Sequence, residues 1–387
     1  MDPLHAESQR LRSSLQFGAV AMRVLLIDEG FMSGAFTARG LRRAGCAVDV
    51  IAATGGSGRC VGGGDSWRLA PRVDDPRLMD VLDEVIVGSR YDIVYPITEP
   101  LQQLLWDEAP AWQTSVYPFV EQRHRAARRD KQRMSELVAS HGIDIPRQVS
   151  ATQDADVRRA VRQLGLPLVI KGISGRGGNS TRICASLHAA LVAAREMTAR
   201  GRVPFAQAYV DGVTFLAGGL FDRGRTLRFY SGAKTVQFPS RVGPAAEITS
   251  VNDAALAAVA TRVFAAAEVT GLASIDLVRD GTGRYHFLEL NPRPWGSIEA
   301  AVGAGVDLFS ALARSWRSER VSPRLEFTDG VQSSIFPLYM LATRSWQSGH
   351  AAHALVPDFR RAFSLARDDP MLAGHVLHRL VRVGLNW

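Results

Sequence analysis

The sequence predicts an α/β fold that opens with a parallel sheet and continues as an α+β unit. Over residues 22–120, short apolar runs of strand length alternate with helical segments, which is typical of an open parallel sheet. Farther along, apolar runs follow one another and include a pair joined through Asp280-Gly281, a strong hairpin turn signal. The length of 387 residues, 46% of them hydrophobic, is sufficient for two or three domains with substantial cores.

The predicted N-terminal domain covers residues 22–120. Residues 1–21 show no signal-peptide pattern and are expected to form a disordered extension, or to result from a start codon placed too early, ahead of Met22. The glycine-rich stretch 55–64 lacks the Lys-Ser/Thr ending of a phosphate loop, so we interpret it as a flexible loop. The expected elements are strands at 23–28, 48–52 and 92–95, and helices at 33–44, at 76–88 and from residue 99 onward.

A second unit is predicted over residues 121–310, with a smaller subdomain at about 150–205. A glycine-rich turn, 172–181, separates two short strands and indicates a hairpin. The region beyond residue 310 is predicted to be a mainly helical extension, 311–387. The expected elements of the second unit are helices at 129–140, 186–199 and 254–269, and strands at 166–171, 182–185, 205–210, 215–221, 226–234, 271–278 and 285–290.

Composition excludes several classes of protein. The formal net charge is +8, but the basic residues are spread along the chain and form no nucleic-acid-binding motif. The densest basic cluster, residues 123–133, is interpreted as a solvated helix face, with phosphate steering beside a nucleotide site as the alternative. The sequence contains no apolar run of about 18 residues, so it predicts no membrane span. Three cysteines with no zinc-site spacing favour a reducing, cytoplasmic compartment.

Oxygen-bearing side chains on the last predicted strand pair indicate a metal site. Glu289 and Asn291 lie two residues apart on one strand and therefore point to the same face. Asp276 lies on the neighbouring strand if the Asp280-Gly281 turn forms a hairpin. Oxygen ligands of this kind suit Mg²⁺, with Mn²⁺ as an alternative. The competing interpretation, solvated sheet residues, is disfavoured by the apolar residues around Glu289.

Arg293 follows Asn291 by two residues and could reach the same face. A guanidinium beside two metal-bound carboxylates is suited to holding a transferring phosphoryl group. The alternative is a surface ion pair with Glu299.

Lysine usage points to a phosphate site. Lys and Arg total 46, yet only Lys131, Lys171 and Lys234 are lysines. A lysine is a compact point charge that fits a tight phosphate pocket, whereas the guanidinium is a wide planar fork. Lys171 ends a buried apolar strand and precedes the glycine-rich turn, whose backbone N–H groups could approach phosphate oxygens.

Taken together, these motifs resemble the ATP-grasp superfamily over about residues 23–310. The run 291–297, Asn-Pro-Arg-Pro-Trp-Gly-Ser, is similar to a form found in carboxylate–amine ligases and carbamoyl-phosphate-synthase-like members. The other matching elements are Asp130-Lys131 with the Gly-Ile-Asp-Ile-Pro run at 142–146, the strand and glycine-rich turn around Lys171, the hinge-like segment Gln207-Ala-Tyr-Val-Asp-Gly212, and the trio Asp276, Glu289 and Asn291.

The resemblance implies an N-terminal domain followed by two subdomains that clamp ATP between them. It also implies a reaction in which ATP phosphorylates a carboxylate and an amine displaces the phosphate. The alternatives are a bicarbonate-using carboxylase or carbamoyl-phosphate-type enzyme, and a non-catalytic ATP-binding regulator. The implied residues are Lys131, Lys171, Gly177, Gly178, Ser180, Gln207, Tyr209, Val210 and Asp211 for ATP; Arg293, Lys234 and Arg241 for catalysis; and Asp276, Glu289 and Asn291 for the metal.

The sequence departs from this pattern in the hinge. Ala208 stands where an acidic residue is frequent, so the nucleotide contact would come from Asp211, Gln207 or another residue. The substrates are expected to be a small carboxylate and a small amine, and a homodimer is left open. Candidate acceptor-pocket residues are Thr98, Glu99 and the 235–247 segment, whereas Trp106, Trp112 and Trp295 are expected in the core.

Overall fold

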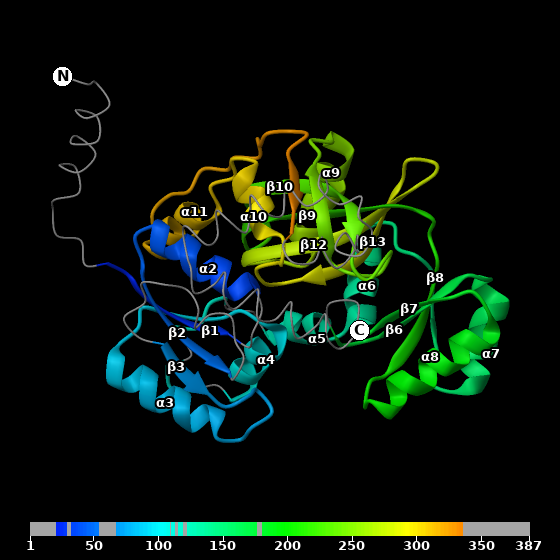
Figure 1. Cartoon of the computed structure of the whole chain (residues 1–387), viewed down its shortest axis with the longest axis horizontal. Helices are drawn as coiled ribbons and strands as arrows, with labels where there is room; N and C mark the ends of the chain where they lie inside the picture. Colours follow the sequence, from blue (N-terminus) through cyan, green and yellow to red (C-terminus); the bar gives the residue numbers. More distant parts are fainter. Residues whose placement is uncertain are drawn as a thin grey trace, which may run out of the picture.

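The computed structural model describes residues 21–28, 32–53, 67–108, 110–112, 115–118, 122–175 and 180–335. The predictions for residues 1–20, for the 55–64 loop and for residues 336–387 lie outside these ranges. The described chain contains three sheets. In Figure 1 the sheet that carries helices α7 and α8 projects to the right of the other two. No helix among the described residues is both long and apolar enough to cross a membrane.

The N-terminal sheet is parallel, as predicted, in the order β3-β2-β1-β4. Its strands are β1 (Arg23–Asp28), β2 (Ala47–Ala53), β3 (Trp67–Ala70) and β4 (Ile93–Pro96). Helices α3 (Leu78–Ser89) and α4 (Glu99–Glu108) cover one face, and α2 (Met32–Arg43) packs on the other. The sequence did not predict β3, whose four residues follow the glycine-rich stretch.

Two short helices lead from this domain into the next. They are α5 (Gln122–Arg129) and α6 (Lys131–Ser140), where one helix was predicted. Asp130 separates them because its side chain accepts hydrogen bonds from the backbone N–H groups of Gln132 and Arg133, which caps α6. Lys131 is thereby fixed as the first residue of α6.

The second sheet with four strands is antiparallel, in the order β5-β8-β6-β7. It is called the four-stranded sheet, as distinct from the parallel N-terminal sheet. It confirms the predicted hairpin around the glycine-rich turn, because Lys171 on β6 pairs with Thr181 on β7. This sheet and its two helices have a separate hydrophobic core, which includes Val157, Leu168, Ile170 and Met197. Its elements are β5 (Gln148–Ser150), α7 (Asp154–Leu164), β6 (Leu168–Gly172), β7 (Thr181–Cys184), α8 (Leu187–Ala199) and β8 (Pro204–Ala208).

A six-stranded antiparallel sheet, in the order β13-β12-β9-β10-β11-β14, completes the described fold. One face packs on α6 and α9, and the other packs on α10 and α11, which in turn contact α2. The elements are β9 (Gly212–Asp222), β10 (Arg225–Gln237), β11 (Ala245–Ser250), α9 (Ala254–Ala266), β12 (Gly271–Asp280), β13 (Tyr285–Asn291), α10 (Ile298–Gly303), α11 (Leu308–Trp316) and β14 (Gln332–Ser334).

The boundary predicted at residue 310 falls inside α11. In the described part of the predicted helical extension, the chain forms the end of α11 and then β14, which pairs with β11 as an edge strand of the six-stranded sheet. Residues up to 335 therefore complete this sheet, and the expected helical extension does not begin at residue 311.

The N-terminal sheet and the six-stranded sheet share one hydrophobic core. Leu41 of α2, Leu220 of β9 and Phe309 of α11 belong to a single buried cluster. The approach of α2 to α11 is so close that a Cβ atom at Gly40 would lie 2.2 Å from the Phe309 ring. The two sheets thus form one body, whereas the four-stranded sheet has a separate core.

The basic cluster at 123–133 is not a solvated face throughout. Arg128 is buried and donates from Nη2 to the carbonyl oxygen of Ala267, 3.0 Å away at the end of α9. Burial lowers the pKa of this guanidinium to about 10. Arg128 therefore joins α5 to the C-terminal end of α9, where backbone carbonyl groups attract a cation.

Candidate active site

Two carboxylates on paired strands form the centre of the site. The β12–β13 hairpin pairs Asp276 with Glu289, as predicted, and Asp280 Oδ1 at its turn accepts from two backbone N–H groups. The next pair is Leu277 with Phe287, so Leu288 is an extra residue on β13. Such a bulge re-aims the neighbouring side chains and is common beside active sites.

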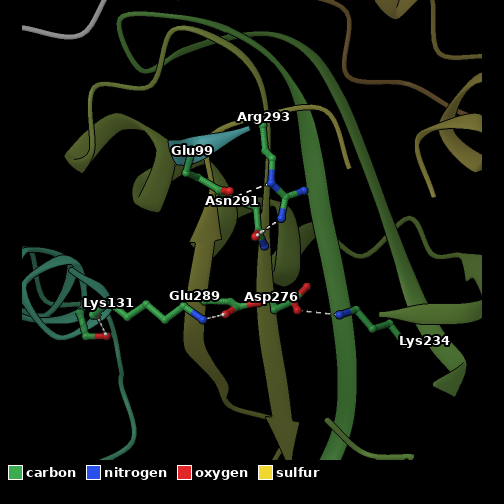
Figure 2. Close-up of polar contacts among 8 residues, drawn as sticks. Glu99, Lys131, Lys234, Asp276, Glu289, Asn291 and Arg293 are labelled. Carbon is green, nitrogen blue, oxygen red and sulfur yellow. Dashed lines mark hydrogen bonds and ion pairs between the residues drawn. The ribbon is translucent and has the colours of Figure 1, made fainter. Parts of the chain in front are cut away.

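Each carboxylate bonds a lysine from another element (Figure 2). Lys131 Nζ, at the start of α6, lies 2.9 Å from Glu289 Oε2. Lys234 Nζ, on β10, lies 2.6 Å from Asp276 Oδ2. Two of the three lysines in the sequence therefore contact the predicted carboxylates, although they come from distant parts of the chain.

These charges shift the pKa values of both acids. Burial raises the pKa of Glu289, but Lys131, Lys171 and Lys234 outweigh it and lower that pKa to about 2. Burial dominates at Asp276 and raises its pKa; Lys234 opposes this shift and the Glu289 carboxylate adds to it. Glu289 is therefore the more firmly ionised member of the pair.

Lys171 is buried at the end of β6 and faces the same carboxylates. Burial lowers its pKa to about 8; the Lys131 ammonium adds to the shift, while Glu289 and Asp276 oppose it. A buried ammonium of this kind gains from an anionic ligand that replaces its lost hydration.

This position gives a pH-dependent prediction. As pH rises through about 8, Lys171 loses its charge, so we expect affinity for ADP without added metal to fall by up to about tenfold per pH unit. Lys171→Arg should bind ADP more weakly at neutral pH and show little further change, because the guanidinium is wider and does not titrate there. Calorimetric titrations at several pH values measure both effects. Affinity in the native protein that does not change with pH would contradict the assignment.

Arg293 joins the end of β13 to the N-terminal domain. Its Nε donates to Glu99 Oε1 at 2.9 Å, and its Nη2 donates to Asn291 Oδ1 at 3.1 Å. The alternative ion pair with Glu299 is wrong, because Glu299 bonds Arg39 at 2.8 Å. Glu99 was among the expected acceptor-pocket residues, and it lies at the start of α4 beside the site.

The larger cavity, about 480 Å³, lies between the four-stranded and six-stranded sheets. The predicted hinge residues Gln207, Tyr209, Val210 and Asp211 line it together with Lys171 and Lys234. Gln207 Nε2, which is buried, finds no hydrogen-bond partner among the described residues, and the same holds for Ser180 Oγ. Buried polar groups are normally satisfied, so Gln207 Nε2, which belongs to a lining residue of this cavity, fits a contact to a polar ligand.

The segment that follows β10 borders the same cavity. Arg241 Nη1 donates to the Tyr209 hydroxyl at 3.0 Å, and that hydroxyl lies 3.2 Å from Asp211 Oδ1. Thr235 and Gln237 also line the cavity. The structure therefore places this part of the 235–247 segment, expected at the acceptor pocket, beside the hinge. Gly177 and Gly178 lie outside the described residues.

A smaller cavity of about 140 Å³ lies on the other side of Glu289. Its walls come from the start of α4, from α5 and α6, from Ser174-Gly175 and from β13. Glu99, Lys131 and Asn291 are among its lining residues, and Glu289 lines both cavities. The predicted metal ligands thus stand between two separate spaces.

Gln102 is a contributor that sequence reasoning missed. It is fully buried on α4 and donates from Nε2 to the carbonyl oxygen of Pro292 at 3.0 Å and to that of Pro96 at 3.3 Å. It thereby fastens the segment carrying Asn291 and Arg293 to the N-terminal sheet. A single glutamine in a helix gives no sequence signal for such a role.

The predicted core tryptophans are confirmed. Trp106, Trp112 and Trp295 are all buried. Trp112 belongs to the core of the N-terminal sheet and Trp295 to the shared core. None of the three is among the lining residues of the two cavities.

Comparison with known proteins identifies the domain that carries this site. Residues 128–297 match the ATP-grasp domain family, and the chain therefore contains an ATP-grasp domain. The D-alanine–D-alanine ligase of Chromohalobacter salexigens is 26% identical over 196 residues, which are 47% of this chain. The match spans 62% of the length of that relative.

Solved structures share the fold. An L-amino acid ligase from Bacillus licheniformis superposes with a TM-score of 0.62 at 18% identity, covering 79% of this chain and 78% of that one. The biotin carboxylase domain of the Hydrogenobacter thermophilus 2-oxoglutarate carboxylase, in complex with MgADP, ADP and bicarbonate, has a TM-score of 0.64 at 13% identity, covering 81% and 74%.

Proposed function

We propose that this protein is an ATP-dependent, ADP-forming ligase that activates a carboxylate as an acyl phosphate and joins it to an amine. The observation that carries the proposal is the position of Glu289, which lines a larger cavity with hinge and lysine residues and a smaller cavity at the N-terminal domain. A phosphoryl group passing from a nucleotide to an acid would cross between two such spaces at this point.

The larger cavity suits ATP. Gln207 and the backbone around Tyr209 and Val210 would hold the adenine at the hinge. Lys171 and Lys234, which line this cavity, and Lys131, which approaches from the smaller cavity, would hold phosphate oxygens as point charges, with Ser180 and the glycine-rich turn donating further hydrogen bonds.

The oxygen donors fit a divalent cation. The candidate site consists of the paired carboxylates Asp276 and Glu289 and the Asn291 amide. It has only two carboxylates, and among the described residues no group of three or more His, Cys, Asp or Glu side chains could hold a metal. A set of two carboxylates and one amide suits Mg²⁺, which keeps several waters and binds phosphate oxygens. When bound, Mg²⁺ supplies charge neutralisation for the phosphates.

The smaller cavity suits the carboxylate substrate. Arg293 does not line it but donates to Glu99 and Asn291, which do, and a guanidinium in this position would orient the acid and stabilise the negative charge of the transferring phosphoryl group. Glu99 sets the orientation of Arg293, and α4 thereby contributes to the choice of substrate. The volume of about 140 Å³ favours a small acid.

A second candidate is activation of bicarbonate, as in a carboxylase or carbamoyl-phosphate-type enzyme. The small volume of the cavity favours it. A regulator without turnover is disfavoured, because Asp276, Glu289, Asn291 and Arg293 are present and arranged together.

A screen for ADP formation tests the proposal. We expect rapid ADP formation with Mg²⁺-ATP only when the correct small acid and amine are both present, because the acyl phosphate is held until the amine attacks it. Pairs of acids and amines are screened, with each component omitted in turn and bicarbonate as a separate arm. ADP formation that needs bicarbonate would support the second candidate. Tight ATP binding without ADP formation in any arm would contradict an enzymatic role.

A further inference from the structure

Both proposed metal carboxylates are already bonded to cations in this structure. Lys234 Nζ lies 2.6 Å from Asp276 Oδ2, and this lysine side chain is only 3% exposed. Lys131 Nζ lies 2.9 Å from Glu289 Oε2. Figure 2 shows the two lysines approaching the carboxylate pair from opposite sides, each along its own ion pair.

The charge balance at this point disfavours a free divalent cation. Two carboxylates face three lysines, because Lys171 also interacts electrostatically with Asp276 and Glu289. A metal ion arriving alone would have to displace two ammonium groups from buried carboxylates, and those groups would remain close to it. A polyphosphate changes this balance because its oxygens offer the displaced lysines new acceptors.

We propose that Lys131 and Lys234 close the metal site while the nucleotide is absent, so that a divalent cation binds only together with the nucleotide. The inference rests on the proposed function, in which Asp276 and Glu289 are metal ligands. Each lysine then has two successive partners: a carboxylate in the free protein and a phosphate oxygen in the complex. The metal and the nucleotide are admitted as one unit, and binding of the metal first is prevented.

Mn²⁺ binding to the full-length protein, followed by electron paramagnetic resonance, tests this order. We expect weak Mn²⁺ binding to the native protein alone and clear binding after addition of a non-hydrolysable ATP analogue. Lys234→Met should raise the affinity for Mn²⁺ without nucleotide by about tenfold or more, because Asp276 loses its bonded cation. Lys234→Arg keeps the charge and should leave Mn²⁺ excluded.

A matched control separates direct pairing from general charge. Arg241→Met removes one positive charge from the same cavity, but Arg241 bonds the Tyr209 hydroxyl and not a metal carboxylate. We therefore expect no gain in Mn²⁺ affinity. Lys131→Met, whose side chain is 18% exposed, provides a second variant if Lys234→Met does not fold.

The outcomes are distinct. Native protein that binds Mn²⁺ equally well with and without the ATP analogue would overturn the inference while leaving the proposed metal ligands intact. So would lysine variants that gain no affinity. Absence of Mn²⁺ binding in every variant, even with the analogue, would instead overturn the proposed function.

Discussion

Glu289→Ala is expected to lower the rate of ADP formation by about a hundredfold or more at saturating Mg²⁺-ATP. The substitution removes a proposed metal donor from the wall between the two cavities and leaves Lys131 without its carboxylate partner. Steady-state rates with the acid and amine identified by the screen measure the effect.

A carboxylate in a surface ion pair provides the control. Glu319 Oε2 lies 2.9 Å from Arg314 Nε and both side chains are about half exposed, so Glu319→Ala should retain nearly full activity. A Glu289→Ala protein with native circular dichroism and undiminished turnover would show that the metal assignment is wrong.

Arg293→Lys is expected to reduce turnover by a similar factor of about a hundred, with little change in ATP affinity. The guanidinium contacts Glu99 through Nε and Asn291 through Nη2, and an ammonium group cannot reproduce both contacts in that geometry. Separate measurement of kcat and of nucleotide affinity distinguishes this loss from a defect in ATP binding.

Arg225→Lys is the corresponding control, because Arg225 forms an exposed ion pair with Asp222 at 3.2 Å, away from both cavities. It should behave like the native protein. If Arg293→Lys keeps its turnover and instead weakens ATP binding, Arg293 belongs to the nucleotide site and not to the acid site.

The sequence predicted those parts of the molecule that depend on local patterns. The position of Asp276 on the strand beside Glu289 followed from a short hairpin with an Asp-Gly turn. The position of Lys171 at a buried strand end followed from an apolar run and a glycine-rich turn. The parallel N-terminal sheet followed from alternating strand and helix patterns.

The parts that were missed depend on distant partners. Strand β14 has three residues and is stabilised by pairing with β11. The ion pair of Arg293 with Glu99 joins residues 194 positions apart, and no local pattern favours Glu99 over Glu299. The bulge at Leu288 depends on the pairing of two complete strands. Tertiary packing decides each of these features.

The core shared by α2, β9 and α11 limits how this protein can be recombined with its relatives. Glu99 and Gln102, which contact the segment of the proposed acid site, belong to a domain whose interior is continuous with that of the six-stranded sheet. A chimera that exchanges residues 22–120 alone would have to match a foreign surface at Phe309 and Leu220. The four-stranded sheet, with its own interior, can be exchanged as a cassette. A change in the N-terminal domain is therefore transmitted through the shared core to the six-stranded sheet, whereas a change inside the four-stranded sheet is not.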